Sequence, residues 1–203
     1  MATFDLREGS PNDIYRILTN IVIPRPIAFV STVSGTGVLN LAPFSFFMVG
    51  GANPPSLMIA PTLTGTGSEK DSLRNIRENG EFVVNTVHRA MAAGMNEASA
   101  SLPPHESEWP RTGFTPQASS FVRPPRVAES LAQLECRLFQ VIEHGDGPGS
   151  ARYILGEILA IHVADDWVEN GRILPLPLLS RLGGADYLDM QDRETFQLDR
   201  PSS

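Results

Sequence analysis

Cysteine is nearly absent from this chain of 203 residues, and so are the features of exported and membrane proteins. The one cysteine, Cys136, cannot form an intrachain disulfide and lies in a strand-like run, so we interpret it as a packed thiol. No apolar stretch approaches the roughly 20 residues of a membrane helix. The N-terminal residues lack the basic patch and apolar run of a secretory signal. We therefore expect a cytoplasmic protein with no membrane partner.

Positive charge is also scarce, and several well-known motifs are missing. The formal net charge of −7 argues against a nucleic-acid partner, because phosphate backbones are bound by clustered Lys and Arg. The sequence holds no P-loop, no Gly-x-Ser-x-Gly nucleophile elbow and no zinc-type Cys/His pairing, so we predict no metal site. Gly65 and Gly67 imitate a dinucleotide-binding pattern, but Lys70 stands where the third glycine belongs. The histidines are far apart in sequence, and we interpret each as structural: His88, His105, His144 and His162.

What the sequence does contain is a series of short β-rich segments separated by turns. Its 17 glycines and 17 prolines favour irregular connections over long helices. Helices are predicted over residues 12–18, 70–78 and 91–100. Strands are predicted over residues 27–33, 38–49, 56–60, 81–88, 131–143 and 152–163, the last two forming a long hairpin. This pattern favours one domain, residues 1–203, folded as a closed antiparallel β-barrel with short flanking helices.

Two segments are predicted to lack regular structure. Residues 101–125 are rich in proline and are expected to form a long excursion over the surface. Loops of this length tend to act as lids or as arms that contact a partner. Residues 199–203 are expected to be frayed.

Hydroxyl, amide and ammonium groups gather in the first third of the chain. A phosphate group needs an ammonium, hydroxyl donors and backbone N–H groups, and the start of the helix at Lys70 offers all three. We therefore predict that Lys70 and Ser72 bind a phosphate. The alternative is an ordinary solvated first helical turn, in which Asp71 is a common helix-start acid.

An ordered set of motifs resembles one known family over nearly the whole chain. The motifs are, in chain order, Pro24-Arg-Pro-Ile-Ala-Phe-Val-Ser-Thr32, Asn40-Leu-Ala-Pro-Phe-Ser-Phe-Phe47, Asn53-Pro-Pro55, Lys70-Asp-Ser-Leu-Arg-Asn-Ile76, Glu81-Phe-Val-Val-Asn85, Pro124-Pro-Arg-Val-Ala-Glu-Ser130, Leu134-Glu-Cys136, Gly156-Glu-Ile-Leu-Ala-Ile-His-Val163, and Arg181-Leu-Gly-Gly184 with Tyr187. Together they resemble the flavin reductase-like family of FMN-binding split barrels.

The resemblance implies a fold and a set of flavin ligands. It implies a six-stranded antiparallel split β-barrel of Greek-key type that forms a homodimer, with FMN in a cleft near the subunit boundary. Ser31 and Thr32 would line the ribityl and ring region, residues 41–45 would run along the isoalloxazine, and Lys70 with Ser72 would hold the phosphate. The full set of expected cofactor-binding residues is Ser31, Thr32, Asn40, Leu41, Ala42, Pro43, Phe44, Ser45, Lys70 and Ser72. Tyr187, Trp109 and Phe114 are interpreted as packing residues, although each could cover the flavin.

The resemblance also implies a redox activity. Flavin accepts hydride at its own N5, so no catalytic acid or base is expected among the protein residues. NADH or NADPH is the expected electron donor, and a partner monooxygenase could receive the reduced flavin. Short flavin reductases often carry an Asp-His pair where this chain reads Ser150 to Tyr153. Two other hypotheses therefore stay open: an FMN-storage flavoprotein without nicotinamide-dependent activity, and a cofactor-free β-barrel used for association.

Overall fold

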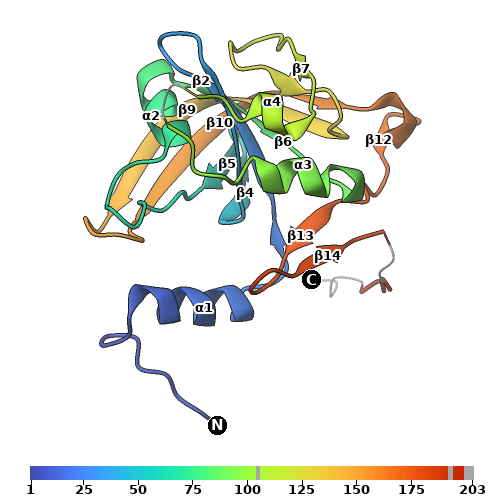
Figure 1. The fold of residues 1–203 in the computed structure, drawn as a ribbon. Coiled ribbons are helices and arrows are strands. Elements are labelled where there is room, and N and C mark those ends of the chain that lie inside the picture. Colours follow the sequence, from blue (N-terminus) through green and yellow to red (C-terminus); the bar gives the residue numbers. More distant parts are fainter. Residues whose placement is uncertain (104–105, 192–193, 199–203) are drawn as a thin grey trace.

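One large antiparallel sheet dominates the computed structural model, which describes residues 1–103, 106–191 and 194–198 (Figure 1). The expected mainly β class is confirmed, and the sheet has seven strands in the order β3-β2-β6-β9-β10-β5-β4. The strand bounds are β2 (Ala28–Val33), β3 (Leu39–Phe44), β4 (Phe47–Ala52), β5 (Pro55–Ile59), β6 (Glu81–Asn85), β9 (Ala132–His144) and β10 (Ala151–Val163). The expected long hairpin is present as β9 and β10.

The chain itself shows that this sheet must curl into a barrel. Strands β3 and β4 lie at opposite edges of the sheet, yet only Ser45 and Phe46 separate them in sequence. Because a residue spans at most about 3.6 Å, the two edges must come close together. The backbone N–H of Ala60, just after β5, donates to the carbonyl of Phe46 at 2.8 Å and so continues the β4–β5 ladder up to this connection. The barrel is therefore nearly closed, with a split where β3 passes into β4.

Two strand predictions need correction where β3 passes into β4. Residues 38–49 were expected to form one strand pairing with residues 27–33, but only β3 pairs with β2, while β4 pairs with β5. The predicted count of six strands becomes seven for this reason. Serine is common in turns, so Ser45 is a weak local signal, but the apolar residues on both sides of it favour one continuous strand. Closure of the barrel explains why the strand breaks here.

Each of the three predicted helices is present, with bounds that differ by one to three residues. Helix α1 (Pro11–Ile21) is longer than expected, and the Ser10 hydroxyl caps it by accepting from the Asp13 N–H. Helix α2 (Asp71–Asn79) ends at Gly80, whose φ of 71° is the left-handed conformation that favours glycine. The expected helix over residues 91–100 is present as η1 (Arg89–Met91) followed by α3 (Ala92–Glu97). No helix in the described ranges is long and apolar enough to cross a membrane.

Smaller elements surround the barrel. They are α4 (Trp109–Thr112), η2 (Asp165–Trp167), β1 (Arg25–Pro26) paired with β13 (Leu179–Arg181), β14 (Tyr187–Asp189) paired with β13, β7 (Pro116–Gln117) paired with β8 (Arg126–Val127), and β11 (Val168–Glu169) paired with β12 (Arg172–Ile173). The expectation of a frayed end at residues 199–203 lies outside the described residues, as does His105.

Side chains of β2 and β3 alternate between two hydrophobic cores. Ala28 and Val30 lie in the barrel core with Phe82 and Ile154, whereas Phe29 and Leu41 lie in a second core with residues of the helices. This second core contains Met91, Met95, Trp109 and Val127. Strand β2 is thus buried on both faces, which explains why its sequence reads as an almost continuous apolar run. Cys136 is buried in the barrel core as expected.

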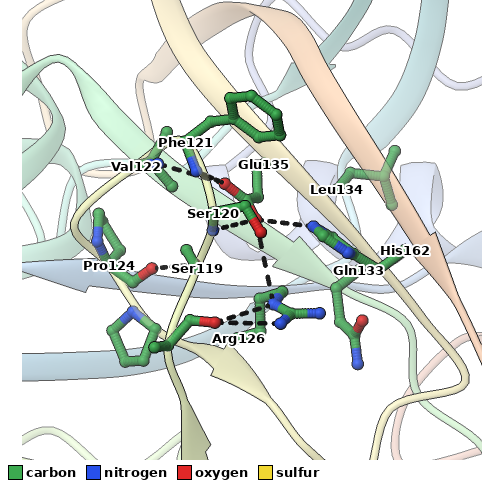
Figure 2. Close-up of polar contacts among 12 residues, drawn as sticks. Ser119, Ser120, Phe121, Val122, Pro124, Arg126, Gln133, Leu134, Glu135 and His162 are labelled. Carbon is green, nitrogen blue, oxygen red and sulfur yellow. Dashed lines mark hydrogen bonds and ion pairs between the residues drawn. The ribbon is translucent and has the colours of Figure 1, made fainter.

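Part of the predicted excursion packs against the barrel, and we call its residues 106–125 the covering layer. Its residues Glu108, Trp109, Thr112 and Val122 are buried. The covering layer is attached to the barrel by Glu135 of β9, whose carboxylate accepts from the backbone N–H groups of Ser120, Phe121 and Val122. Figure 2 shows these bonds converging on one carboxylate.

His162 and Arg126 also lie close to the Glu135 carboxylate. The His162 ring of β10 lies 2.7 Å from the Glu135 carboxylate, and Arg126 lies 4.0 Å from it. Burial opposes ionisation of Glu135, but the backbone bonds and His162 outweigh it and lower the pKa of this carboxyl group. The interpretation of His162 as structural agrees with this position.

Candidate functional site

Three adjoining hollows lie along the split of the barrel. Their volumes are about 250, 270 and 120 Å³, and all three are lined by Pro43 at the end of β3. The first is also lined by Lys70 and Ser72, and the third shares Lys70 with it. The second extends to Arg181 and Tyr187. Because the hollows share lining residues, we describe them together as the cleft, with a Lys70 end and an Arg181 end.

Lys70 is the only lysine in the sequence, and it lies between the first and third hollows. Its ammonium is 5.3 Å from the centre of the Phe44 ring, a cation–π distance. The side chain remains accessible to solvent, but the protein around it removes enough water to lower the pKa of the ammonium. Among the described residues no carboxylate pairs with it, because Asp71 pairs with Arg74 and Glu69 with Arg77.

The start of α2 offers further donors beside this ammonium. The amide of Asn40 donates to the Ser72 hydroxyl at 2.9 Å, which leaves the proton of that hydroxyl available for another acceptor. No acceptor among the described groups takes the backbone N–H of Asp71 or of Ser72, since these belong to the unpaired first turn of the helix. Ammonium, hydroxyl and N–H groups therefore gather at one end of the cleft, as an anionic phosphate requires.

One buried carboxylate lies in the same hollow. Glu108 of the covering layer is 5% exposed, and it accepts from the backbone N–H of Leu41 at 3.0 Å. Strand β3 is an edge strand, so this bond satisfies an N–H that has no sheet partner. Burial raises the pKa of Glu108, and the Leu41 bond offsets only part of that rise. No sequence signal marked Glu108, since its partner lies 67 positions away.

The wall between the two ends is the last part of β3. Asn40 and Ala42 line the first hollow, Phe44 and Ser45 line the second and third, and Pro43 lines all three. Pro43 follows Leu41 by two residues, so it lies on the same open edge, where the missing N–H of proline removes no sheet bond. This wall presents mainly apolar groups and is suited to a flat ring.

Three residues of the expected set lie behind this wall. Leu41 packs into the second core, and its N–H is bonded to Glu108. The Ser31 hydroxyl donates to the carbonyl of Pro125, and Thr32 accepts from the Asn75 amide. Both hydroxyl residues are fully buried, and neither lines a hollow. Their contact with a flavin stays a prediction, and the structure gives their hydroxyls other partners.

The aromatic candidates divide between core and cleft. Trp109 is buried in the second core, and Phe114 packs edge-on against Phe29 with ring centres 5.6 Å apart. Tyr187 lines the second hollow together with Tyr15 of α1, which the sequence gave no reason to select. Only Tyr187 of the three candidates therefore lies where it can contact a bound ring.

A nearly closed antiparallel β-barrel with a cleft along its split has the architecture of split-barrel flavoproteins. The family model described as "Flavin reductase like domain" matches residues 20–183. The chain belongs to this family, so the resemblance seen in the motifs is confirmed. Family membership supports flavin-related oxidoreduction as the general class of activity.

Relatives and solved structures are similar to this chain over nearly its full length. The protein YwrF of Bacillus subtilis is 41% identical and is covered completely, as is this chain. The crystal structure of nitrilotriacetate monooxygenase component B from Bacillus cereus is 38% identical, with a TM-score of 0.91 and 98% of each chain covered. The 2-nitrobenzoate 2-nitroreductase NbaA of Pseudomonas fluorescens is 28% identical, with a TM-score of 0.86 and both chains covered completely.

Proposed function

We propose that this protein is an FMN-binding oxidoreductase that uses NADH or NADPH to reduce flavin. The observation that carries the proposal is the single lysine at one end of the cleft, unpaired among the described residues and beside the donors of α2. A doubly charged phosphate monoester matches this set of donors, whereas riboflavin would leave it unused. The preference for FMN over a flavin without phosphate follows from this match.

Different residues of the cleft would bind different parts of FMN. Lys70, Ser72 and the free N–H groups of α2 would hold the phosphate, and Asn40 would orient the Ser72 hydroxyl toward it. Ala42, Pro43, Phe44 and Ser45 would lie against the ring and exclude water from it. A bound flavin supplies the hydride chemistry, since it accepts hydride on its own ring. The protein therefore needs to bind, orient and shield, and we assign no acid or base to the reaction.

We expect a homodimer, because apolar side chains remain exposed on α1, just after it and on β4. Leu18, Ile21 and Val22 are 43%, 70% and 60% exposed, and Val49 of β4 is 70% exposed. Figure 1 shows α1 extending away from the barrel, where one chain alone leaves it largely uncovered. A second copy would bury this surface next to Tyr15, which lines the cleft. By likeness to the monooxygenase component, we also propose a partner monooxygenase that receives reduced flavin.

The nicotinamide step is tested by a steady-state assay of the purified protein. With free FMN or FAD present, oxidation of NADH or NADPH at 340 nm should exceed the background rate of free flavin. No turnover above that background with either nicotinamide would reject the reductase proposal. A protein that retains FMN but oxidises neither nicotinamide would be a storage flavoprotein, and one that purifies colourless and gains no thermal stability from FMN would be the association module.

Replacing Glu108 by glutamine is expected to tighten FMN binding several-fold at pH 8. The glutamine oxygen can still accept from the Leu41 N–H, while the negative charge next to the phosphate is removed. Because burial raises the pKa of Glu108, its charge penalty is absent at low pH and grows as the pH rises through that pKa. Fluorescence titration of FMN over a series of pH values should therefore show a difference between Glu108→Gln and wild type that grows as the pH rises. If Glu108→Gln and wild type bind FMN equally well at every pH, the phosphate does not lie beside Glu108.

A further inference from the structure

The Arg181 end of the cleft differs in chemistry from the Lys70 end. The second hollow has a volume of about 270 Å³ and is lined by aromatic and apolar side chains, among them Tyr15, Phe44, Met95 and Tyr187. Asn96 and Ser99 add neutral polar groups. Among the described residues, Arg181 is the only charged one that lines it. The hollow therefore combines one cation with a mixed wall that includes three aromatic side chains.

The guanidinium of Arg181 is held in place but not neutralised. Its central carbon lies 4.4 Å from the centre of the Tyr187 ring, and it donates to the Tyr187 hydroxyl and to the Gly184 carbonyl. These partners are neutral, and no acidic group forms an ion pair with Arg181 among the residues that the structure describes. Partners of this kind fix the orientation of the planar group while leaving its charge available to a ligand.

A second guanidinium lies near this one. Arg25 is 4% exposed, and it donates to the carbonyls of Thr19, Val22 and Leu182 and, at 3.4 Å, to the Ser45 hydroxyl of the cleft. Burial, opposed by Tyr15 and assisted by the charge of Arg181, lowers the pKa of Arg25. Two cations therefore repel each other at this end of a chain with net charge −7. An anion in the hollow would relieve that repulsion.

We infer that the Arg181 hollow is a subsite for a small aromatic carboxylate, whose carboxylate pairs with Arg181 and whose ring packs against Tyr15, Met95 and Tyr187, leaving residues 43–45 to the flavin. The planar fork of arginine matches a carboxylate with two parallel hydrogen bonds. The volume suits one substituted ring, and Tyr187 and Met95 offer it contact surface. The inference deepens the proposed function, on which it rests, by naming the class of molecule that would lie next to the flavin.

The test compares three probes that separate charge from ring. Sodium benzoate carries both features, benzamide keeps the ring without the charge, and acetate keeps the charge without the ring. Isothermal titration of the protein, both as purified and after saturation with FMN, should show benzoate binding at least tenfold more tightly than benzamide or acetate. Similar affinities for benzoate and benzamide would overturn the inference, because Arg181 would then contribute nothing.

Variants of Arg181 test whether the affinity for benzoate depends on that residue. Arg181→Gln should weaken benzoate binding about tenfold or more and leave benzamide binding unchanged, since only the charged hydrogen bonds are lost. Arg181→Lys should lie between wild type and Arg181→Gln, because it keeps the charge but loses the fork. Thermal unfolding shows whether each variant is folded. Arg181→Lys provides a second test if Arg181→Gln is not. Unchanged benzoate affinity in a folded Arg181→Gln variant would overturn the inference.

A titration with FMN separates this inference from the proposed function. Arg181→Gln should bind FMN within about threefold of wild type, whereas an equal loss of FMN and benzoate affinity would assign Arg181 to the flavin and overturn the subsite. If wild type binds benzoate through Arg181 but does not bind FMN, the proposed function fails and the subsite stands. If FMN binds and benzoate does not, the subsite fails alone.

Discussion

Replacing Lys70 by alanine is expected to weaken FMN binding about tenfold or more while riboflavin loses little. Hydrogen bonds to charged groups contribute roughly 1.5–3 kcal/mol, and about 1.4 kcal/mol corresponds to a factor of ten. Lys70 supplies the only ammonium side chain of the protein, and the carboxylates on either side of it in sequence are paired with arginines. Riboflavin has no phosphate, so it should respond only to lost contacts with the aliphatic part of the lysine. Fluorescence titration of both ligands measures the difference.

Arg74→Ala is the matched control for this experiment. Arg74 lines the same hollow, but its guanidinium is engaged by Asp71 and by the carbonyl of Glu69, so FMN should lose less affinity than with Lys70→Ala. Lys70→Arg should recover part of the wild-type affinity, because the positive charge returns. If FMN and riboflavin weaken equally in Lys70→Ala, the phosphate does not lie at this residue.

The single lysine also permits a direct chemical test. An amine-reactive reagent can modify only Lys70 and the N-terminal amine in this sequence. The lowered pKa of Lys70 leaves more of its amine unprotonated and reactive at a given pH than an ordinary lysine. Excess FMN should slow the modification of Lys70 but not of the N-terminus, as followed by mass spectrometry of peptides.

Replacing Glu135 by alanine is expected to lower the free energy of unfolding by about 3 kcal/mol. The substitution leaves three buried or half-buried backbone N–H groups without their acceptor, and each unsatisfied buried group costs about 1–3 kcal/mol before relaxation. It also leaves His162 and Arg126 without their carboxylate partner (Figure 2). Because residues 120–122 belong to the covering layer, detachment of that layer from the barrel should accompany the loss. Urea unfolding measures the free energy, and hydrogen exchange of residues 120–122 locates it.

Glu129→Ala provides the comparison, because it removes a carboxylate with a similar role at an exposed position. Glu129 accepts from the backbone N–H of Thr115 in the same covering layer, but solvent can replace that bond. Its loss should therefore cost at most about 1 kcal/mol. A Glu135→Ala variant no less stable than Glu129→Ala would show that the buried carboxylate does not anchor the layer.

The contribution of Glu135 should also disappear in acid. Its folded-state pKa lies below the ordinary value of 4.5, so the folded protein binds this proton less tightly than the unfolded chain. The stabilisation is then fully present above that ordinary value and is lost as the pH falls through the lowered pKa. The difference in stability between wild type and Glu135→Gln should accordingly shrink below about pH 4.5.

The sequence by itself determined most of the elements and one end of the cleft. The β-rich runs, the cap at Ser10, the left-handed stop at Gly80 and the long hairpin of β9 and β10 all depend on local propensity and turn chemistry, which a sequence shows directly. The cluster at Lys70 and Ser72 could be selected because its donors lie within one helical turn. The family could be recognised because its motifs occur in order along the chain.

Only the tertiary structure decided where the chain bends and what meets at the split. The break at Ser45 and Phe46 follows from closure of the barrel, and the bonds of Glu108 to Leu41 and of Ser31 to Pro125 join residues 67 and 94 positions apart. Arg181 and Tyr15 reach the same hollow from opposite ends of the chain. Such contacts depend on which surfaces face each other after folding, and no local pattern of side chains encodes that choice.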